Sequence, residues 1–162
     1  DWTQKVNRKM YRAGVKSILD LGLTLEYLET HGVPVLGFKT DELPAFYTRK
    51  SGFNVDFKLN SPQEIAHFLY SKWAMNLKGG VVVTNPIPKK YQLDYDAIMD
   101  TIETAVKEAE NLGIKGKEST PFLLEKIATL TDGKSLDANI KLVLNNAALA
   151  AKIACSYSNI TI

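Results

Sequence analysis

Apolar residues recur every three or four positions along much of the chain, a spacing that places them on one face of a helix. The clearest helix start is at Ser61, where Pro62 takes the first helical position and Glu64 completes a capping box. The same periodicity predicts further helices over residues 21–31, 95–112, 122–130 and about 135–151.

Three shorter stretches have the patterns of strands. Residues 54–59 alternate between apolar and polar side chains, as in a strand with one buried face. Residues 81–84 are β-branched throughout and predict a strand buried on both faces, and residues 33–38 form a short apolar strand. Because strands are interspersed with helices, we expect an α/β layered fold. Three strands are few for a closed domain, so the sheet is expected to need partners from elsewhere.

The composition is that of an ordinary globular protein. The chain has 162 residues, 45% hydrophobic and 23% charged, which is enough for one domain with a core of its own. Its 20 basic and 18 acidic residues give a net charge of +2, which argues against a strongly basic nucleic-acid-binding protein. The single cysteine excludes an intramolecular disulfide or a cysteine-rich metal site. No apolar run is long enough to span a membrane.

The two ends of the chain differ from its middle. Residues 1–12 are polar and carry four basic residues against one acidic residue, which predicts a solvated arm, with an organelle presequence as the alternative. Residues 157–162 are expected to form a loose tail. A cytoplasmic location is predicted, or an organelle if the arm is a presequence.

Lys16 is the first candidate for chemistry. It follows a glycine at the edge of an apolar segment, where burial would favour the neutral amine that a Schiff base requires. On spacing alone, a surface lysine beside a helix start is the simpler interpretation.

Polar residues at three further places could contact a ligand. Asn85 follows the predicted strand 81–84 at its carboxyl end, where ligands gather in open α/β sheets, although a stiff turn explains it equally well. Thr120 stands before a proline at a predicted helix start, where an anion can bind, and a plain helix cap is the alternative. Asn139 and Asn146 lie seven residues apart and share a helix face, where they need a ligand or a polar network.

Two further features have simpler explanations. Asn145 lies on another side of the same predicted helix, so we expect it to face solvent. Aromatic and basic residues are interleaved over residues 46–57, a pattern that can stack nucleic-acid bases. Because aromatic and basic residues are so frequent in this stretch, we expect the aromatic residues to belong to the hydrophobic core and the basic residues to lie at its edge.

Five long motifs follow one another along the chain. They are AGVKSILDLGLTLEYLETHGVPV from Ala13, LPAFYTR from Leu43, GGVVVTNPIP from Gly79, GKESTPFLL from Gly116 and SLDANIKLVLNNAALAAKIA from Ser135. Together they resemble the pseudouridine-5′-phosphate glycosidase family. The resemblance extends over about residues 13–154, and several long motifs in the right order make it specific.

The resemblance implies an α/β/α sandwich, usually assembled as a trimer, and manganese as the cofactor. It implies reversible cleavage of the C–C glycosidic bond of pseudouridine 5′-phosphate to uracil and ribose 5-phosphate. The family attaches the opened sugar to a lysine as a Schiff base, and that lysine matches Lys16. The family's active-site asparagine matches Asn139, a supporting polar group, and Asn85 and Thr120 lie in family-like motifs as candidate substrate-binding residues.

The family's segment before the lysine motif has no counterpart in this sequence. That segment supplies the proton-donating glutamate and the manganese-binding aspartate, so no metal ligand is expected in this chain. We therefore expect residues 13–156 to be the carboxyl-terminal portion of the glycosidase domain, an incomplete sandwich with weak or no activity on its own. Two alternatives stay open, a non-catalytic interaction module and another Schiff-base sugar-phosphate lyase. Neither nucleic acid nor a membrane is an expected partner.

Overall fold

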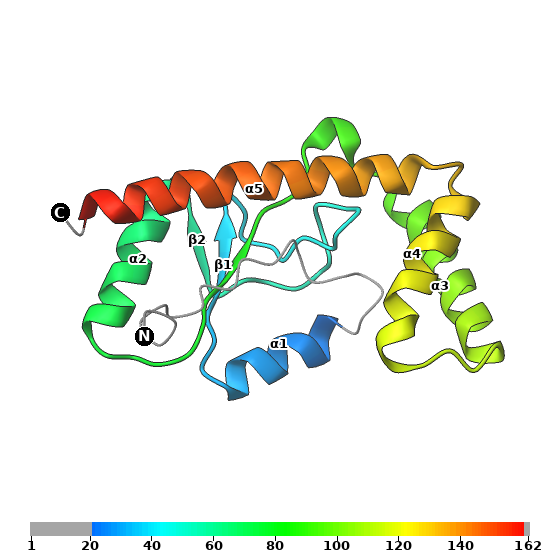
Figure 1. Cartoon of the computed structure of the whole chain (residues 1–162), viewed down its shortest axis with the longest axis horizontal. Helices are drawn as coiled ribbons and strands as arrows, with labels where there is room; N and C mark the ends of the chain where they lie inside the picture. Colours follow the sequence, from blue (N-terminus) through cyan, green and yellow to red (C-terminus); the bar gives the residue numbers. More distant parts are fainter. Residues whose placement is uncertain (1–20, 161–162) are drawn as a thin grey trace, which may run out of the picture.

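The computed structural model describes residues 21–160, which form a small parallel sheet with helices around it (Figure 1). Lys16 and the predicted basic arm lie outside these residues. The elements in chain order are α1 (Leu21–Thr30), β1 (Val35–Phe38), β2 (Phe57–Leu59), α2 (Pro62–Ala74), β3 (Val82–Thr84), η2 (Lys89–Tyr91), α3 (Tyr95–Asn111), η3 (Gly116–Glu118), α4 (Ser119–Leu130) and α5 (Lys134–Ile160).

The sheet has the strand order β2-β1-β3, and both pairings are parallel. Leu36 in the central strand lies opposite Phe57 on one side and Val83 on the other. All three predicted strands are present, but they are shorter than their sequence patterns. Of the predicted strand 54–59, only the last three residues pair with another strand, as β2. Phe57 in this edge strand is 53% exposed.

Helices α2 and α5 pack on the sheet through one apolar cluster. Its buried members are Leu36, Ile65, Leu69, Val81, Val83, Leu149 and Ile153. Helix α1 lies at the opposite end of the strands from α5 in Figure 1, and none of its residues is buried. Gly32 ends α1 with φ +62°, a left-handed conformation that glycine adopts without steric cost.

A second core lies beyond the sheet, where α3 and α4 pack together against the start of α5. It includes Ile98, Ile102, Ala105, Ala109, Leu123, Ile127, Ala138 and Leu142. The loops after β1 and β3 reach into it through Phe46, Tyr47 and Ile87. Helix α5 therefore connects both cores, and it runs along the whole length of the molecule in Figure 1.

The outer face of α5 differs from the prediction. The residues expected to carry the apolar pattern are Ile140, Leu144, Ala148 and Ala151, and all four are exposed. The buried stripe lies on another face, because α5 packs through Ala138, Leu142, Leu149 and Ile153. The helix is thus apolar on two sides, and its outer side shows Leu136, Ile140, Val143 and Leu144 at 53%, 48%, 50% and 59% exposure.

Two helix boundaries also differ from the prediction. The loose tail expected over 157–162 was wrong for residues 157–160, which continue α5 to Ile160 and place Tyr157 against the sheet-side core. The α2 cap is confirmed, since the Ser61 side chain accepts a bond from the Glu64 amide. The carboxylate of Glu64, however, accepts from the amide of Asn60, one residue before the position that a capping box uses.

Candidate functional site

The carboxyl ends of the three strands meet at one edge of the sheet, because both pairings are parallel. The chain leaves this edge in two long connections, residues 39–56 after β1 and residues 85–94 after β3. Ligands of open α/β sheets bind outside this kind of edge. These two connections therefore define the candidate site.

The turn after β3 is held by three side chains that come from far along the chain. The side-chain nitrogen of Asn85 donates to the Asn146 side-chain oxygen at 3.0 Å. Asn145 donates to the carbonyl of Pro86 at 3.3 Å, and Arg49 donates to the carbonyl of Ile87 at 2.7 Å. Asn85, Pro86 and Ile87 are thus each held by one hydrogen bond. The first two bonds come from side chains on α5, and the third comes from the connection after β1. This arrangement fixes the turn without regular secondary structure.

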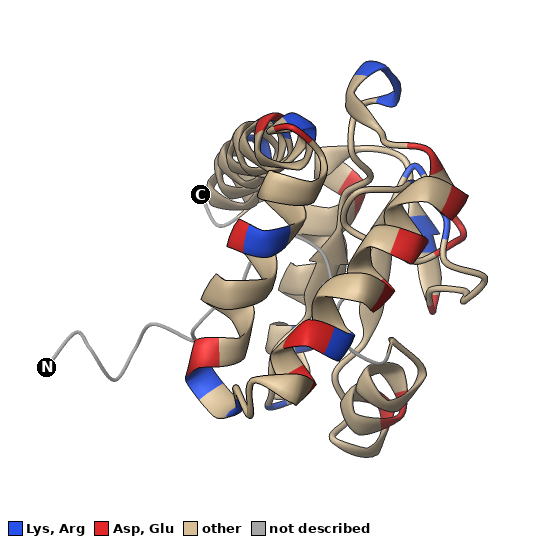
Figure 2. Ribbon diagram, turned by 90° about the vertical axis from the view of Figure 1, so that its right-hand side faces the viewer, with Lys and Arg blue, Asp and Glu red and all other residues tan. Residues whose placement is uncertain are grey.

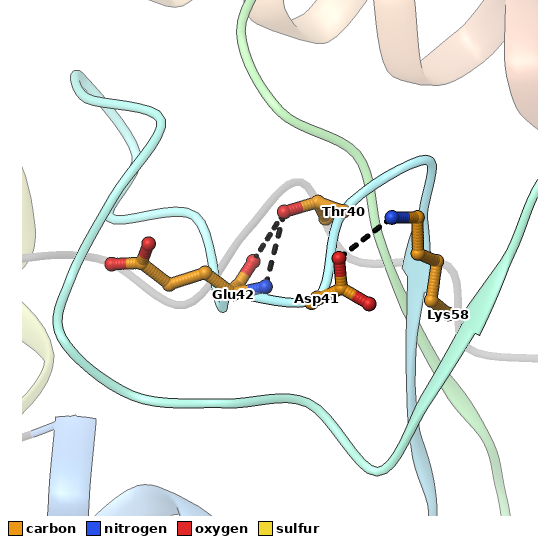
Figure 3. A network of polar contacts seen from close by, with 4 residues as sticks. All are labelled: Thr40, Asp41, Glu42 and Lys58. Carbon is orange, nitrogen blue, oxygen red and sulfur yellow. Dashed lines mark hydrogen bonds and ion pairs between the residues drawn. The ribbon is translucent and has the colours of Figure 1, made fainter.

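The connection after β1 begins with the polar network drawn in Figure 3. The hydroxyl of Thr40 donates to the carbonyl of Glu42 and accepts from its amide, which closes a tight turn. The carboxylate of Asp41 meets the ammonium of Lys58 at 2.6 Å and ties this turn to β2. Gly37, the third residue of β1, is required here, because a Cβ at this position would clash with the backbone carbonyl oxygen of Thr40.

The same connection is closed further along by Glu42. One of its carboxylate oxygens accepts from the amides of Ser51 and Gly52, at 2.8 and 2.7 Å. The hydroxyl of Ser51 donates to the carbonyl of Leu43 at 2.6 Å. Charge-assisted bonds to backbone amides are stronger than neutral ones, so this internal carboxylate holds residues 42–52 as a compact loop.

Tyr47 anchors that loop inside the second core. Its side chain is 2% exposed, and its carbonyl accepts from the amide of Leu93 at 3.0 Å, which joins the two connections. Burial raises the pKa of the phenol to about 12, and the neighbouring Ser135 hydroxyl offsets part of the rise. The phenol therefore stays neutral at physiological pH and has a structural part in the site.

The structure brings some of the predicted site residues together and separates others. Asn85 is buried and donates to the side chain of Asn146 on α5, a partner that the sequence did not predict for it. Asn139 is half-buried on the same helix, about 10 Å of helix rise before Asn146. Thr120 lies in the first turn of α4, and none of the described contacts joins it to Asn85. Lys16 lies outside the described residues.

The predicted cap at Thr120 was wrong. Helix α4 begins one residue earlier, at Ser119, directly after the short helix η3, and Glu118 occupies the cap position without a side-chain bond. The preceding 3-10 turn continues into the α-helix, so the helix start needs no hydroxyl there.

Two members of the site were missed by sequence reasoning. Asn145 was expected to face solvent, but it is half-buried and bonded to Pro86. Arg49 belongs to the interleaved aromatic and basic residues 46–57, a pattern that gave no sign of its hydrogen bond to the carbonyl of Ile87. A signal for Asn145 was present in the sequence, since two adjacent asparagines are unfavourable within a helix unless both find partners.

The anchors of the turn are amides, backbone carbonyls and one guanidinium. Such groups orient a ligand by hydrogen bonds, and they supply no nucleophile. The side-chain nitrogen of Asn146 is buried and has no partner among residues 21–160, so it can donate to an acceptor from outside this part of the chain. Within the same residues no three His, Cys, Asp or Glu side chains form a group that could hold a metal ion. Manganese therefore has no fitting site there.

Comparison with known proteins identifies the relatives of this chain. The family model of indigoidine synthase A like protein matches residues 5–156, a range that begins inside the segment expected as a separate arm. A pseudouridine-5′-phosphate glycosidase from Clostridium botulinum is 64% identical over 148 residues, which are 91% of this chain and 48% of that protein. One from Geobacillus kaustophilus is 61% identical over 154 residues, 95% of this chain and 51% of that protein. The chain thus spans about half the length of these relatives.

Two solved structures share the fold. An indigoidine synthase A-like protein from Thermotoga maritima gives a TM-score of 0.80 at 39% identity, over 89% of this chain and 47% of that one. The prealnumycin C-glycosynthase AlnA, in complex with ribulose 5-phosphate, gives 0.83 at 33% identity, over 96% and 52%. These matches confirm the expected α/β fold, here as part of a larger one. The chain belongs to the indigoidine synthase A like family, and the resemblance to pseudouridine-5′-phosphate glycosidases carried by its motifs is confirmed.

Proposed function

We propose that this chain is part of an enzyme that reversibly cleaves the C–C glycosidic bond of pseudouridine 5′-phosphate to uracil and ribose 5-phosphate. The observation that carries the proposal is the 64% identity to the Clostridium botulinum protein of that name. The shared fold with a C-glycosynthase in complex with a pentulose phosphate supports the same bond type and the same class of sugar.

Lys16 is the proposed nucleophile of this reaction. Its neutral amine forms a bond to C1′ as the bond from C1′ to the ring oxygen breaks, and the ring oxygen takes up the proton that the attached nitrogen gives up, which leaves an open-chain sugar on a secondary amine. The nitrogen lone pair then forms a C=N bond while the bond from C1′ to uracil C5 breaks and C5 takes a proton. Water hydrolyses the resulting iminium, which releases ribose 5-phosphate and returns the free amine. A carbon leaving group needs this electron sink, because two carboxylates alone suit the easier C–O bond.

Asn139, Asn85 and Thr120 are the proposed polar groups around the substrate. Asn139 would act as a supporting hydrogen-bonding group, since its half-buried position on α5 keeps the amide within reach of a ligand at this side of the helix. Asn85 would position the turn after β3 through its bond to Asn146. Thr120 is proposed to bind substrate because it lies in a family-like motif. None of the described contacts of α4 supports this role.

Manganese is proposed as a cofactor of the complete enzyme only. Residues 21–160 contain no group of three His, Cys, Asp or Glu side chains that could hold it, so no step of this reaction is assigned to a metal. No helix among residues 21–160 has the length and apolar character to cross a membrane. A cytoplasmic location stays a prediction.

The proposed function is tested with a chimera in which the part of the Clostridium botulinum relative that this chain does not span is placed before Ala13. The chimera is expected to release uracil from pseudouridine 5′-phosphate, whereas the 162-residue chain alone is expected to release little or none. Uridine 5′-phosphate, which has an N-glycosidic bond, is the control substrate. A folded chimera that does not release uracil, or one that cleaves only other sugar phosphates, would contradict the proposal in favour of an interaction module or a different lyase.

We also propose assembly into a trimer, in which the outer apolar side of α5 is covered by a second copy. A helix that is apolar on two sides is characteristic of a buried helix, and α5 carries no charged residue between Lys141 and Lys152. Leu144→Glu is expected to shift the chimera from trimer to monomer in sedimentation equilibrium. Leu112→Glu is the matched control, because Leu112 is 62% exposed and lies on another helix end. A monomeric parent, or a trimer that tolerates Leu144→Glu, would refute this surface.

A further inference from the structure

The two edges of the sheet differ in burial and in charge. At the β2 edge, Phe57 is 53% exposed, and the exposed Lys58 forms an ion pair with Asp41 at 2.6 Å. A lysine on an edge strand opposes the pairing of a further strand, because its charge would have to leave water. At the other edge, β3 carries no charged residue, so none of it is blue or red in Figure 2. Val83 is 6% exposed and Thr84 is fully buried, so β3 has the burial of an interior strand although it lies at an edge.

The register of β3 shows which of its backbone groups point away from the sheet. The amide of Val82 donates to the carbonyl of Pro34 at 2.9 Å, so the backbone groups of Val82 face β1. Those of Thr84 face β1 as well, because the backbone groups of successive residues in a strand point to opposite sides. The amide and the carbonyl of Val83 therefore point outward, and no backbone hydrogen bond formed within residues 21–160 uses them.

These two outward groups are costly to leave without partners. A backbone amide or carbonyl that is buried without a hydrogen bond costs free energy comparable to that of the lost bond. Water can bind the outward groups at an exposed edge such as β2, but Val83 is almost withdrawn from solvent. The outer edge of β3 therefore needs a backbone partner that residues 21–160 do not supply.

Three sources could provide this partner, and the chain favours one of them. The relatives are about twice as long as this chain, so their other half is long enough to contribute strands. Residues 1–12 are a poor match, because they carry four basic residues and a strand beside a buried parallel strand is apolar. A second copy would offer its own three-residue β3, and the two strands would pair about a two-fold axis, which does not fit the proposed trimer.

We propose that the outer edge of β3 binds an extended, uncharged segment from the half of the protein that this chain does not span, and that this segment continues the sheet as a further strand. Its backbone accepts from the amide of Val83 and donates to the carbonyl of Val83. The number of strands left open which edge is completed, and the burial of β3 selects its edge over that of β2. Since Asn85 directly follows β3, the added strand also ties the other half of the protein to the candidate site.

The test is hydrogen exchange of single backbone amides in the 162-residue chain and in the chimera with the Clostridium botulinum part. In the chain alone, the amide of Val83 is expected to exchange about a hundredfold or more faster than those of Val82 and Thr84, which face β1. In the chimera, all three amides are expected to exchange at similar rates. The amide of Phe57 is the matched control. It points outward at the β2 edge, since the preceding amide of Asp56 donates to Val35, and it is expected to exchange rapidly in both proteins.

Three results would overturn the proposal. The first is a Val83 amide that is protected in the chain alone, because the chain itself, or a second copy if protection rises with concentration, would then occupy the edge. The second is a Val83 amide that stays unprotected in the folded chimera, and the third is an equal gain of protection at Phe57.

The experiment separates this proposal from the proposed function, because exchange is measured without turnover. Protection of Val83 in a chimera that releases no uracil would contradict the proposed function alone. If the chimera does not fold, the amides of the Clostridium botulinum relative that align with Val82, Val83 and Thr84 decide the question in the same way.

Discussion

Replacing Lys16 with alanine is expected to lower uracil formation by the chimera by about a thousandfold or more, because the reaction loses its nucleophile. The C–C bond to uracil has no other electron sink in the proposed route. Binding of the phosphorylated substrate should change far less than turnover, since the lysine acts on C1′ rather than on the phosphate. The measurement is the rate of uracil release at saturating pseudouridine 5′-phosphate.

A trapping experiment tests the same residue directly. Borohydride added with ribose 5-phosphate is expected to reduce the Schiff base and leave the sugar attached to Lys16, which peptide mass spectrometry locates. Lys117→Ala is the control, because Lys117 lies in η3, away from the connections after the strands. Labelling that persists in Lys16→Ala, or turnover that the substitution leaves intact, would refute the proposed nucleophile.

The free energy of unfolding is expected to fall by about 2–3 kcal/mol between pH 10 and pH 12 through Tyr47 alone. Burial raises the pKa of this phenol from 10.0 to about 12 in the folded chain, whereas the unfolded chain titrates near 10. The unfolded state therefore loses its proton first as the pH rises, which favours unfolding. The contribution is complete below pH 10 and is lost as the pH passes through the folded pKa.

Urea unfolding of the chain at several pH values measures this loss. Tyr47→Phe is expected to flatten the curve between pH 10 and pH 12, at a cost of about 1 kcal/mol at neutral pH for the lost hydroxyl. Tyr27→Phe is the control, because Tyr27 is 64% exposed and its phenol remains in water. If Tyr47→Phe keeps the full alkaline loss, the buried phenol is not its source.

Secondary structure was largely predictable because it depends on local chemistry. The cap at Ser61 and the proline after it specify the start of α2 regardless of what the helix packs against. The β-branched residues before Asn85 likewise indicated β3. The end of α5 was not predictable in this way, since Tyr157 is held by packing on the sheet-side core.

The candidate site was likewise predictable from the sequence only in part. The sequence marked Asn85 as a polar residue after a strand, and the structure pairs it with Asn146, 61 positions away. The choice of Asn146 rather than Asn139 as that partner depends on where α5 crosses the sheet. Arg49 and Asn145 were missed because their partners are backbone carbonyls, which any sequence provides.

By itself the sequence determined the family, the α/β class and the identity of the lysine proposed for catalysis, because ordered motifs and hydrophobic periodicity are properties of the chain alone. Only the tertiary structure decided which side of α5 is buried. A helix with apolar residues on two sides has no local preference between them, so the choice is made by the sheet and by α3 and α4 packing against one side. The same packing placed the two connections side by side, where the amide of Leu93 donates to the carbonyl of Tyr47.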